Sequence, residues 1–114
     1  MIRSFAGTAI LLAAIALAPA HAVAAAVSGN ELRQQCDEPK FGRYICMGYI
    51  RGVVEMATLT IPPTAAGAFC LPSEVTTNQV VEVVKKYMQD NPERLHEIAA
   101  ALIVSRLHVV FPCG

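Results

Sequence analysis

The 114-residue chain contains no tryptophan, and aromatic residues make up only 6% of it. Charged residues are also scarce, at 16%, and the 9 basic side chains balance the 9 acidic ones. A chain without excess positive charge lacks the basic patch that nucleic-acid binding requires, which argues against that class of function. Apolar residues, at 54%, argue against a disordered chain, and the length allows one small domain.

Sequence signatures of common catalytic sites are also missing. There is no glycine-rich phosphate loop, no G-x-S-x-G and no H-E-x-x-H. His96 and His108 would lie on different sides of one helix, and Ser105 near His108 has no evident acid to orient the imidazole ring. We therefore predict a protein that is not an enzyme and that uses no metal and no cofactor.

The first residues of the chain have the features of a secretory signal peptide. A short start with one positive charge precedes Phe5–Ala18, which holds no charged side chain, and small residues with the A-x-A spacing follow. The candidates for the last residue of the signal are Ala22 and Ala24. A transmembrane anchor is the alternative, but it needs about 20 apolar residues, and a proline and a histidine interrupt this stretch. We expect a signal peptide over 1–24, export of the chain, and a single domain over 25–114.

Four cysteines lie beyond the expected signal peptide, and no two of them form a C-x-x-C pair. The missing spacing argues against a zinc site of that type and against a thioredoxin-like redox site. An even number of cysteines in an exported chain predicts two disulfides. The four residues are Cys36, Cys46, Cys70 and Cys113.

Apolar residues at helical spacing predict an all-α domain, a bundle of one short and three longer helices. The pairs Ser28 with Glu31 and Thr76 with Gln79 have the capping-box form that begins a helix. Pro92 fits the first position of the last helix. The expected helices cover residues 29–36, 41–60, 77–89 and 92–109.

The expected hairpin of the last two helices favours one pairing of the cysteines. A link of about two residues makes these helices antiparallel neighbours, so Cys70 before the first and Cys113 after the second lie at the same open end. This arrangement favours Cys70–Cys113 with Cys36–Cys46. Two other pairings stay open: Cys36–Cys113 with Cys46–Cys70, and Cys36–Cys70 with Cys46–Cys113.

Gly48 and Gly52 lie four residues apart on the side of the second helix that faces away from its apolar stripe. Each glycine costs a helix about 1 kcal/mol relative to alanine, so we expect a packing reason for the pair. Either the chain's own following loop, residues 61–72, covers this groove, or a second molecule does. The groove and the nearly all-round apolar last helix together predict a homodimer. The loop holds three prolines, and we expect its end to be pinned to the core and its 63–67 tip to be exposed.

The string Cys46-Met47-Gly48-Tyr49-Ile50-Arg51-Gly52 resembles the C-x-G-Y-I-x-G signature of the Tai family, the immunity proteins against type VI secretion amidases. Further likenesses follow in order along the chain: Phe69-Cys70-Leu71-Pro72, Val80 to Tyr87, Asn91-Pro92-Glu93 and Phe111-Pro112-Cys113. The resemblance implies an HdeA-like helical fold, a periplasmic location and a protein that often works as a homodimer. It also implies a partner, an exported peptidoglycan-cleaving amidase whose active-site cleft the immunity protein covers.

We expect the contact surface for such a partner on the loop tip and on the polar face of the third helix. Prolines in the loop lower the cost of ordering it on binding. The candidate contact residues are Pro63, Thr64, Ala65, Ala66, Gly67, Glu82, Lys85, Lys86 and Gln89. Two other functions stay open: a periplasmic acid-stress chaperone of HdeA type, and an envelope adaptor domain with no toxin partner.

Overall fold

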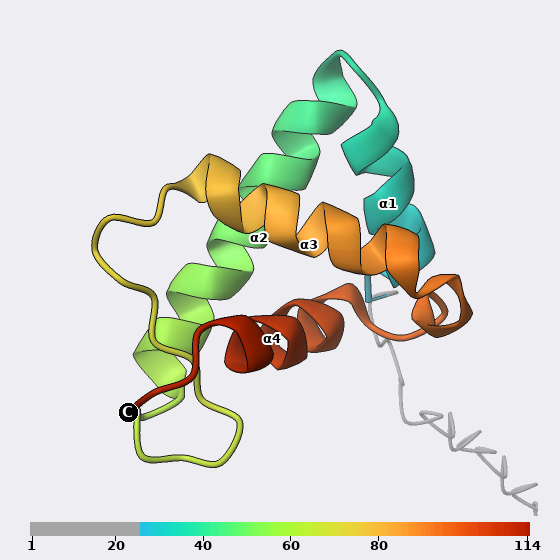
Figure 1. The fold of residues 1–114 in the computed structure, drawn as a ribbon. Coiled ribbons are helices and arrows are strands. Elements are labelled where there is room, and N and C mark those ends of the chain that lie inside the picture. Colours follow the sequence, from blue (N-terminus) through green and yellow to red (C-terminus); the bar gives the residue numbers. More distant parts are fainter. Residues whose placement is uncertain (1–25) are drawn as a thin grey trace, which may run out of the picture.

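The computed structural model describes residues 26–114, and the expected signal peptide lies outside these described residues. Figure 1 shows the four α-helices, with a short 3-10 helix between the last two. The elements are α1 (Gly29–Asp37), α2 (Phe41–Thr60), α3 (Thr77–Asp90), η1 (Pro92–Arg94) and α4 (Ala99–Val110). The expected all-α class is confirmed for this part of the chain. None of these helices is long and apolar enough to cross a bilayer.

The predicted capping box begins α1. The Ser28 hydroxyl accepts a hydrogen bond from the Glu31 N–H at 3.2 Å, and the Glu31 carboxylate accepts one from the Ser28 N–H at 2.8 Å. Leu32 and Cys36 are buried on one face of the helix. A bond between Cys36 and Cys46, with a Cα–Cα distance of 4.9 Å, joins α1 to the first half of α2. We call it the α1–α2 disulfide.

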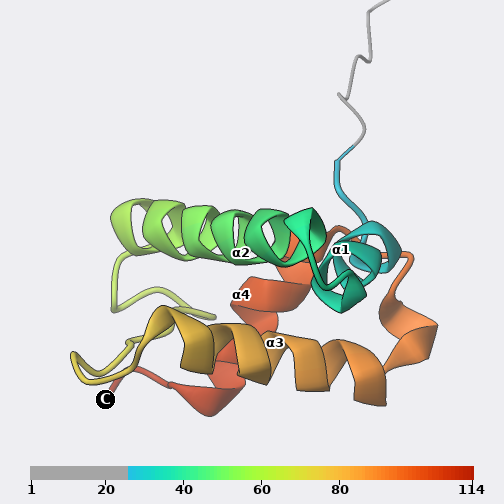
Figure 2. The ribbon, with the colours of Figure 1, turned by 90° about the horizontal axis from the view of Figure 1, so that it is seen from above.

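The helix α2 is 20 residues long and carries two different faces. Its inward stripe, the apolar stripe that lies opposite Gly48 and Gly52, is buried or half-buried against the other helices. Figure 2 shows α2 and α3 in separate layers, with α4 passing from one level to the other. The stripe consists of Cys46, Tyr49, Ile50, Val53, Val54 and Ala57.

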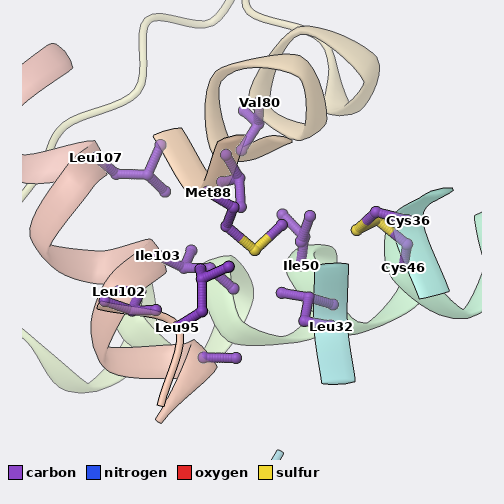
Figure 3. Packing of buried hydrophobic residues seen from close by; sticks show 12 residues of the cluster. Leu32, Cys36, Cys46, Ile50, Val80, Met88, Leu95, Leu102, Ile103 and Leu107 are labelled. Atoms are coloured by element: carbon purple, nitrogen blue, oxygen red, sulfur yellow. A yellow bond between two sulfur atoms is a disulfide. The ribbon is translucent and has the colours of Figure 1, made fainter. Parts of the chain in front are cut away.

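The core forms where the four α-helices meet. Figure 3 shows Met88 reaching from α3 into the middle of the buried cluster, between side chains of α2 and α4. The fully buried row of α3 is Val80, Val84 and Met88, whereas Val83 and Tyr87 are only half-buried. Spacing alone does not show which edge of an apolar stripe lies deepest, so the sequence does not single out Met88.

The last helix begins later than the sequence predicts, and the expected helix over 92–109 is wrong in its first part. Pro92–Arg94 form η1, and the chain is extended at Ile98, with φ −62° and ψ 125°. The helix α4 then runs from Ala99. Pro92 therefore starts a helical turn, as expected, but the turn does not continue into α4.

The early end of η1 has a physical reason in the N-terminal segment. The Gly29 N–H donates to the Glu97 carbonyl at 2.9 Å, and the Asn30 N–H donates to the Leu95 carbonyl at 2.8 Å. These N–H groups belong to the first turn of α1 and have no partner inside that helix. In a continuous last helix the two carbonyls would accept from N–H groups four residues later instead. Gly29 and Asn30 lie far from Leu95 and Glu97 along the chain. Local sequence patterns therefore do not reveal that these two segments share hydrogen bonds.

A second bond, Cys70–Cys113, closes the other end of the domain, and we call it the C-terminal disulfide. Its Cα–Cα distance is also 4.9 Å. The Cys70 N–H donates to the Phe111 carbonyl at 2.8 Å, and Phe69 forms an isolated bridge with Pro112. The structure thus forms the pairing of the four cysteines that the sequence favoured.

Candidate binding surface

The side of α2 that faces away from the core exposes large apolar side chains near both of its ends. The exposed fraction is 81% for Phe41 and for Leu59, 63% for Tyr44, 58% for Met56 and 55% for Ile45. Steps of three and four residues place these side chains on one stripe, which we call the outer face of α2. Large exposed apolar side chains grouped in this way mark a candidate interaction surface.

Gly48 and Gly52 lie in the middle of the outer face of α2. A Cβ atom at either position would meet no other atom within 4 Å. Beside them runs a groove of about 580 Å³ between α2 and α4, with Ala100 and Val104 on the α4 side. Of the two alternatives for this groove, the one in which the chain's own loop covers the glycines is therefore wrong. Of that loop, Ile61 lines the groove, and the rest turns away toward the C-terminus.

The loop that follows α2 is pinned at its end. Ala68 is buried, and its carbonyl accepts a hydrogen bond from His108 Nδ1 of α4 at 2.6 Å. Gly67 has φ +83°, a backbone conformation that favours glycine, so this position turns the chain toward the core. At the loop tip Pro63, Thr64 and Ala66 are exposed, and Ala65 and Gly67 are half-buried.

The polar face of α3 lies apart from the loop tip. Glu82, Lys86 and Gln89 are exposed, and Lys85 is half-buried. Glu82 and Lys85 line a hollow together with Arg43, and this hollow lies beside the α1–α2 disulfide, near the N-terminal end of α2. The loop tip follows the other end of that helix, which is about 30 Å long. The nine predicted contact residues therefore form two separate patches, the loop-tip patch and the α3 patch, and nothing in the structure tests either as a contact.

A cluster of charged and aromatic side chains ties η1 to its neighbours. The Arg94 guanidinium donates two hydrogen bonds of 2.9 Å to Glu97 and a further one to the Tyr87 hydroxyl. The Arg106 guanidinium lies 5.3 Å from the centre of the Tyr87 ring. Hydrogen bonds from Arg94 hold the pKa of Glu97 below its ordinary value. These contacts fix the turn before α4, so we interpret the cluster as structural.

The side chains of Ser105 and His108, which the sequence analysis considered as catalytic candidates, form hydrogen bonds with backbone carbonyls. Ser105 Oγ donates to the Leu102 carbonyl at 3.1 Å, and the imidazole of His108 holds the loop. All four cysteines are in disulfides. Between residues 26 and 114 no group of three or more His, Cys, Asp and Glu side chains could hold a metal ion.

The fold and these surfaces define a small all-α domain, cross-linked by two disulfides, with exposed apolar and polar patches. A family model for Rap1a immunity proteins matches residues 28–113. The chain belongs to this family. Searches of curated proteins and of solved structures find no match.

The match begins at the capping serine of α1 and ends at the last cysteine, so it includes every described helix and both disulfides. The expected class, an immunity protein, is confirmed by this family. Membership of the Tai family and likeness to HdeA stay predictions.

Proposed function

We propose that this protein binds an effector toxin and neutralises it without any catalytic step of its own. The observation that carries the proposal is the immunity-family match over residues 28–113. The structure supports a binding role, because two disulfides and a buried core hold the surfaces rigid. A rigid surface loses little conformational entropy when a partner docks, so more of the contact energy appears as affinity.

The effector, in our proposal, is a peptidoglycan amidase delivered by type VI secretion, and the two proteins meet in the periplasm. The string from Cys46 to Gly52 supports the amidase as target, through its resemblance to the Tai signature. The signal-peptide features of residues 1–24 support export. Two disulfides also fit an oxidising compartment. An immunity protein over the active-site cleft would keep peptidoglycan away from the amidase.

Two pairs of substitutions test which surface meets the amidase. Thr64→Arg with Ala66→Arg changes the loop-tip patch, and Lys86→Glu with Gln89→Glu changes the α3 patch; all four residues are exposed. Because the patches lie apart, each double variant is the matched control of the other. We expect the wild type to inhibit peptidoglycan hydrolysis with Kd of about 1 nM or tighter, and the loop-tip variant to lose at least 100-fold of that affinity.

The results separate three claims. Undiminished inhibition by the loop-tip variant, with loss in the α3 variant, would move the contact surface to α3. Undiminished inhibition by both would place the contact elsewhere on the domain. Absence of binding to any exported amidase would contradict the amidase as target, and a different toxin bound at one-to-one stoichiometry would keep the immunity role.

One observation favours a second candidate function, a periplasmic chaperone of HdeA type. The outer face of α2 exposes large apolar side chains, as a surface that holds unfolded clients would. A chaperone should suppress aggregation of many unrelated proteins at low pH. We expect this protein to have no such effect, which light scattering of an acid-denatured test protein would measure.

A further inference from the structure

The two disulfides differ in their exposure to solvent. Cys36 and Cys46 are 7% and 1% exposed, and these small fractions already include any access through the hollow beside the pair. Cys70, in contrast, is exposed, and Cys113 is half-buried. Thiol–disulfide exchange requires a thiolate to reach one of the two sulfur atoms, so its rate depends on access. A reductant in solution therefore reaches the C-terminal disulfide more readily than the α1–α2 disulfide.

The two disulfides also differ in the noncovalent contacts that accompany them. Beside the C-terminal disulfide, Phe69 forms an isolated bridge with Pro112, and the Cys70 N–H donates to the Phe111 carbonyl at 2.8 Å. A short extended pair of this kind is at best marginally stable without further support. The helices α1 and α2 share the buried core in addition to their disulfide. Loss of the C-terminal disulfide should therefore act locally, on the segments that it joins.

We propose that the C-terminal disulfide is a redox switch that sets the affinity of this protein for its effector. A dithiol reduces this bond while the α1–α2 disulfide and the core stay intact. The loop of residues 61–72 then loses its covalent tie to the C-terminal segment, and its 63–67 tip is no longer held in one position. The inference rests on the proposed function, because it takes the loop tip as the surface that meets the amidase.

The reaction is an exchange of bonds between sulfur atoms. One thiolate of the dithiol attacks Cys70 Sγ, the bond to Cys113 breaks, and Cys113 leaves as a thiolate that takes up a proton. The second thiolate of the dithiol then attacks the first one's sulfur in the mixed disulfide, which frees Cys70 as a thiol and closes the disulfide of the reductant. The dithiol thus gives up two electrons and two protons, and the two cysteines take them up.

The remaining contacts of the loop explain why its release would weaken binding. At its beginning, the Ile61 N–H donates to the Ala57 carbonyl at 2.8 Å and so stays with α2. At its end, reduction leaves the hydrogen bond from His108 Nδ1 to the buried Ala68, which ties the loop to α4 only at that residue. A loop with fewer ties samples more conformations, and a partner must order it again at a cost in entropy. Reduced protein should therefore bind the amidase more weakly than oxidised protein.

Timed alkylation of the exported domain in dithiothreitol tests the selectivity of reduction. Iodoacetamide labels each free thiol, and peptide mapping by mass spectrometry assigns the label. Cys70 and Cys113 should be labelled at least about tenfold faster than Cys36 and Cys46, because access sets the rate. The same measurement in urea is the control, since the two pairs should react at similar rates once the fold no longer protects one of them. Equal rates in the folded domain, or faster labelling of Cys36 and Cys46, would overturn the inference.

Hydrogen exchange tests whether the loop is released. Replacing Cys70 and Cys113 by serine should speed exchange of the amides at positions 68 and 70 and leave the buried α4 residue Ile103 unchanged. The matched variant, with Cys36 and Cys46 replaced by serine, should keep the loop amides as slow as in the wild type. Wild type with only the C-terminal disulfide reduced and alkylated gives the same comparison without a substitution. Equal exchange of the loop amides with and without this disulfide would contradict the release.

Inhibition of the amidase tests the effect on affinity. Protein whose C-terminal disulfide has been reduced, freed of dithiothreitol before the assay, should bind the amidase with a Kd raised about tenfold, and reoxidation should restore the original value. Equal inhibition by the oxidised and reduced forms would overturn the switch. Absence of inhibition by the oxidised form would contradict the proposed function and with it the effect on affinity. The selective release of the loop would then still stand on the alkylation and exchange measurements.

Discussion

Replacing Gly29 with alanine should destabilise the domain, although alanine is a better helix former than glycine. A Cβ at this position would lie 2.9 Å from the Cα of Leu95, 3.0 Å from its carbonyl oxygen and 2.8 Å from a methyl carbon of Leu102. Two of these atoms belong to the backbone, which cannot rotate away as a side chain can. The first turn of α1 must therefore move away from the segment before α4.

The size of the effect follows from what this movement breaks. Forcing one extra carbon into a packed site costs about 1–3 kcal/mol. The movement also lengthens the hydrogen bond from the Gly29 N–H to the Glu97 carbonyl, now 2.9 Å, which is worth about 1 kcal/mol. The gain in helix propensity, up to ~1 kcal/mol, offsets part of this. We expect a net loss of about 1–3 kcal/mol, which lowers the melting temperature of a domain of this size by roughly 5–20 °C.

Urea unfolding with the disulfides intact measures the change, at a concentration where the protein is monomeric. Gly48→Ala is the matched control, because a Cβ there meets nothing within 4 Å and the helix propensity alone should stabilise by up to ~1 kcal/mol. An unchanged or raised stability of Gly29→Ala would refute the reasoning, because it would mean that the contact between α1 and the segment before α4 is not tight.

Three further predictions concern the disulfides, the pH dependence and the loop. Replacing both cysteines of the C-terminal disulfide by serine should lower the free energy of unfolding by about 4 kcal/mol, and the same change in the α1–α2 disulfide by about 2.7 kcal/mol. The difference arises because the two disulfides close loops of 43 and 10 residues, respectively. The urea midpoints of the two variants measure it. Arg94 lowers the pKa of Glu97 in the folded state, so the stabilising effect of this carboxylate is complete above its ordinary pKa of 4.5 and disappears as the pH falls below that value. Glu97→Gln should therefore flatten the acid side of a plot of melting temperature against pH. An unaltered plot would count against the Arg94–Glu97 pair. His108→Ala should speed hydrogen exchange around Ala68 and leave the core amides unaffected, and equal exchange in both proteins would contradict the role of the ring as the anchor of the loop.

Local patterns in the sequence were sufficient for most of the fold. Both capping boxes, the length of α2 and its inward stripe follow from residue types and spacing, and the structure confirms them. The predicted start of α4 was wrong because the N–H groups of Gly29 and Asn30 donate hydrogen bonds to the carbonyls of Glu97 and Leu95. Competition between segments so far apart along the chain leaves no local signal in the sequence.

The candidate surfaces were less predictable than the fold. The apolar residues on the outward side of α2, such as Phe41 and Leu59, were missed, although their spacing was a usable signal. The inward stripe alone explains why this segment is a helix, and it predicts no role for the large side chains on the other side. The loop was one of two candidates to cover Gly48 and Gly52, but the hydrogen bond from His108 to Ala68 and the C-terminal disulfide hold its end beside α4.

Titration of the purified protein into a peptidoglycan-hydrolysis assay tests the proposed immunity function most directly. The probe is the amidase that co-purifies with the exported protein from the periplasm of its own cells, with purified peptidoglycan as substrate. The proposed function predicts that hydrolysis stops at a one-to-one ratio of protein to amidase, with Kd of about 1 nM or tighter. Hydrolysis that continues unchanged in the presence of excess protein would contradict it.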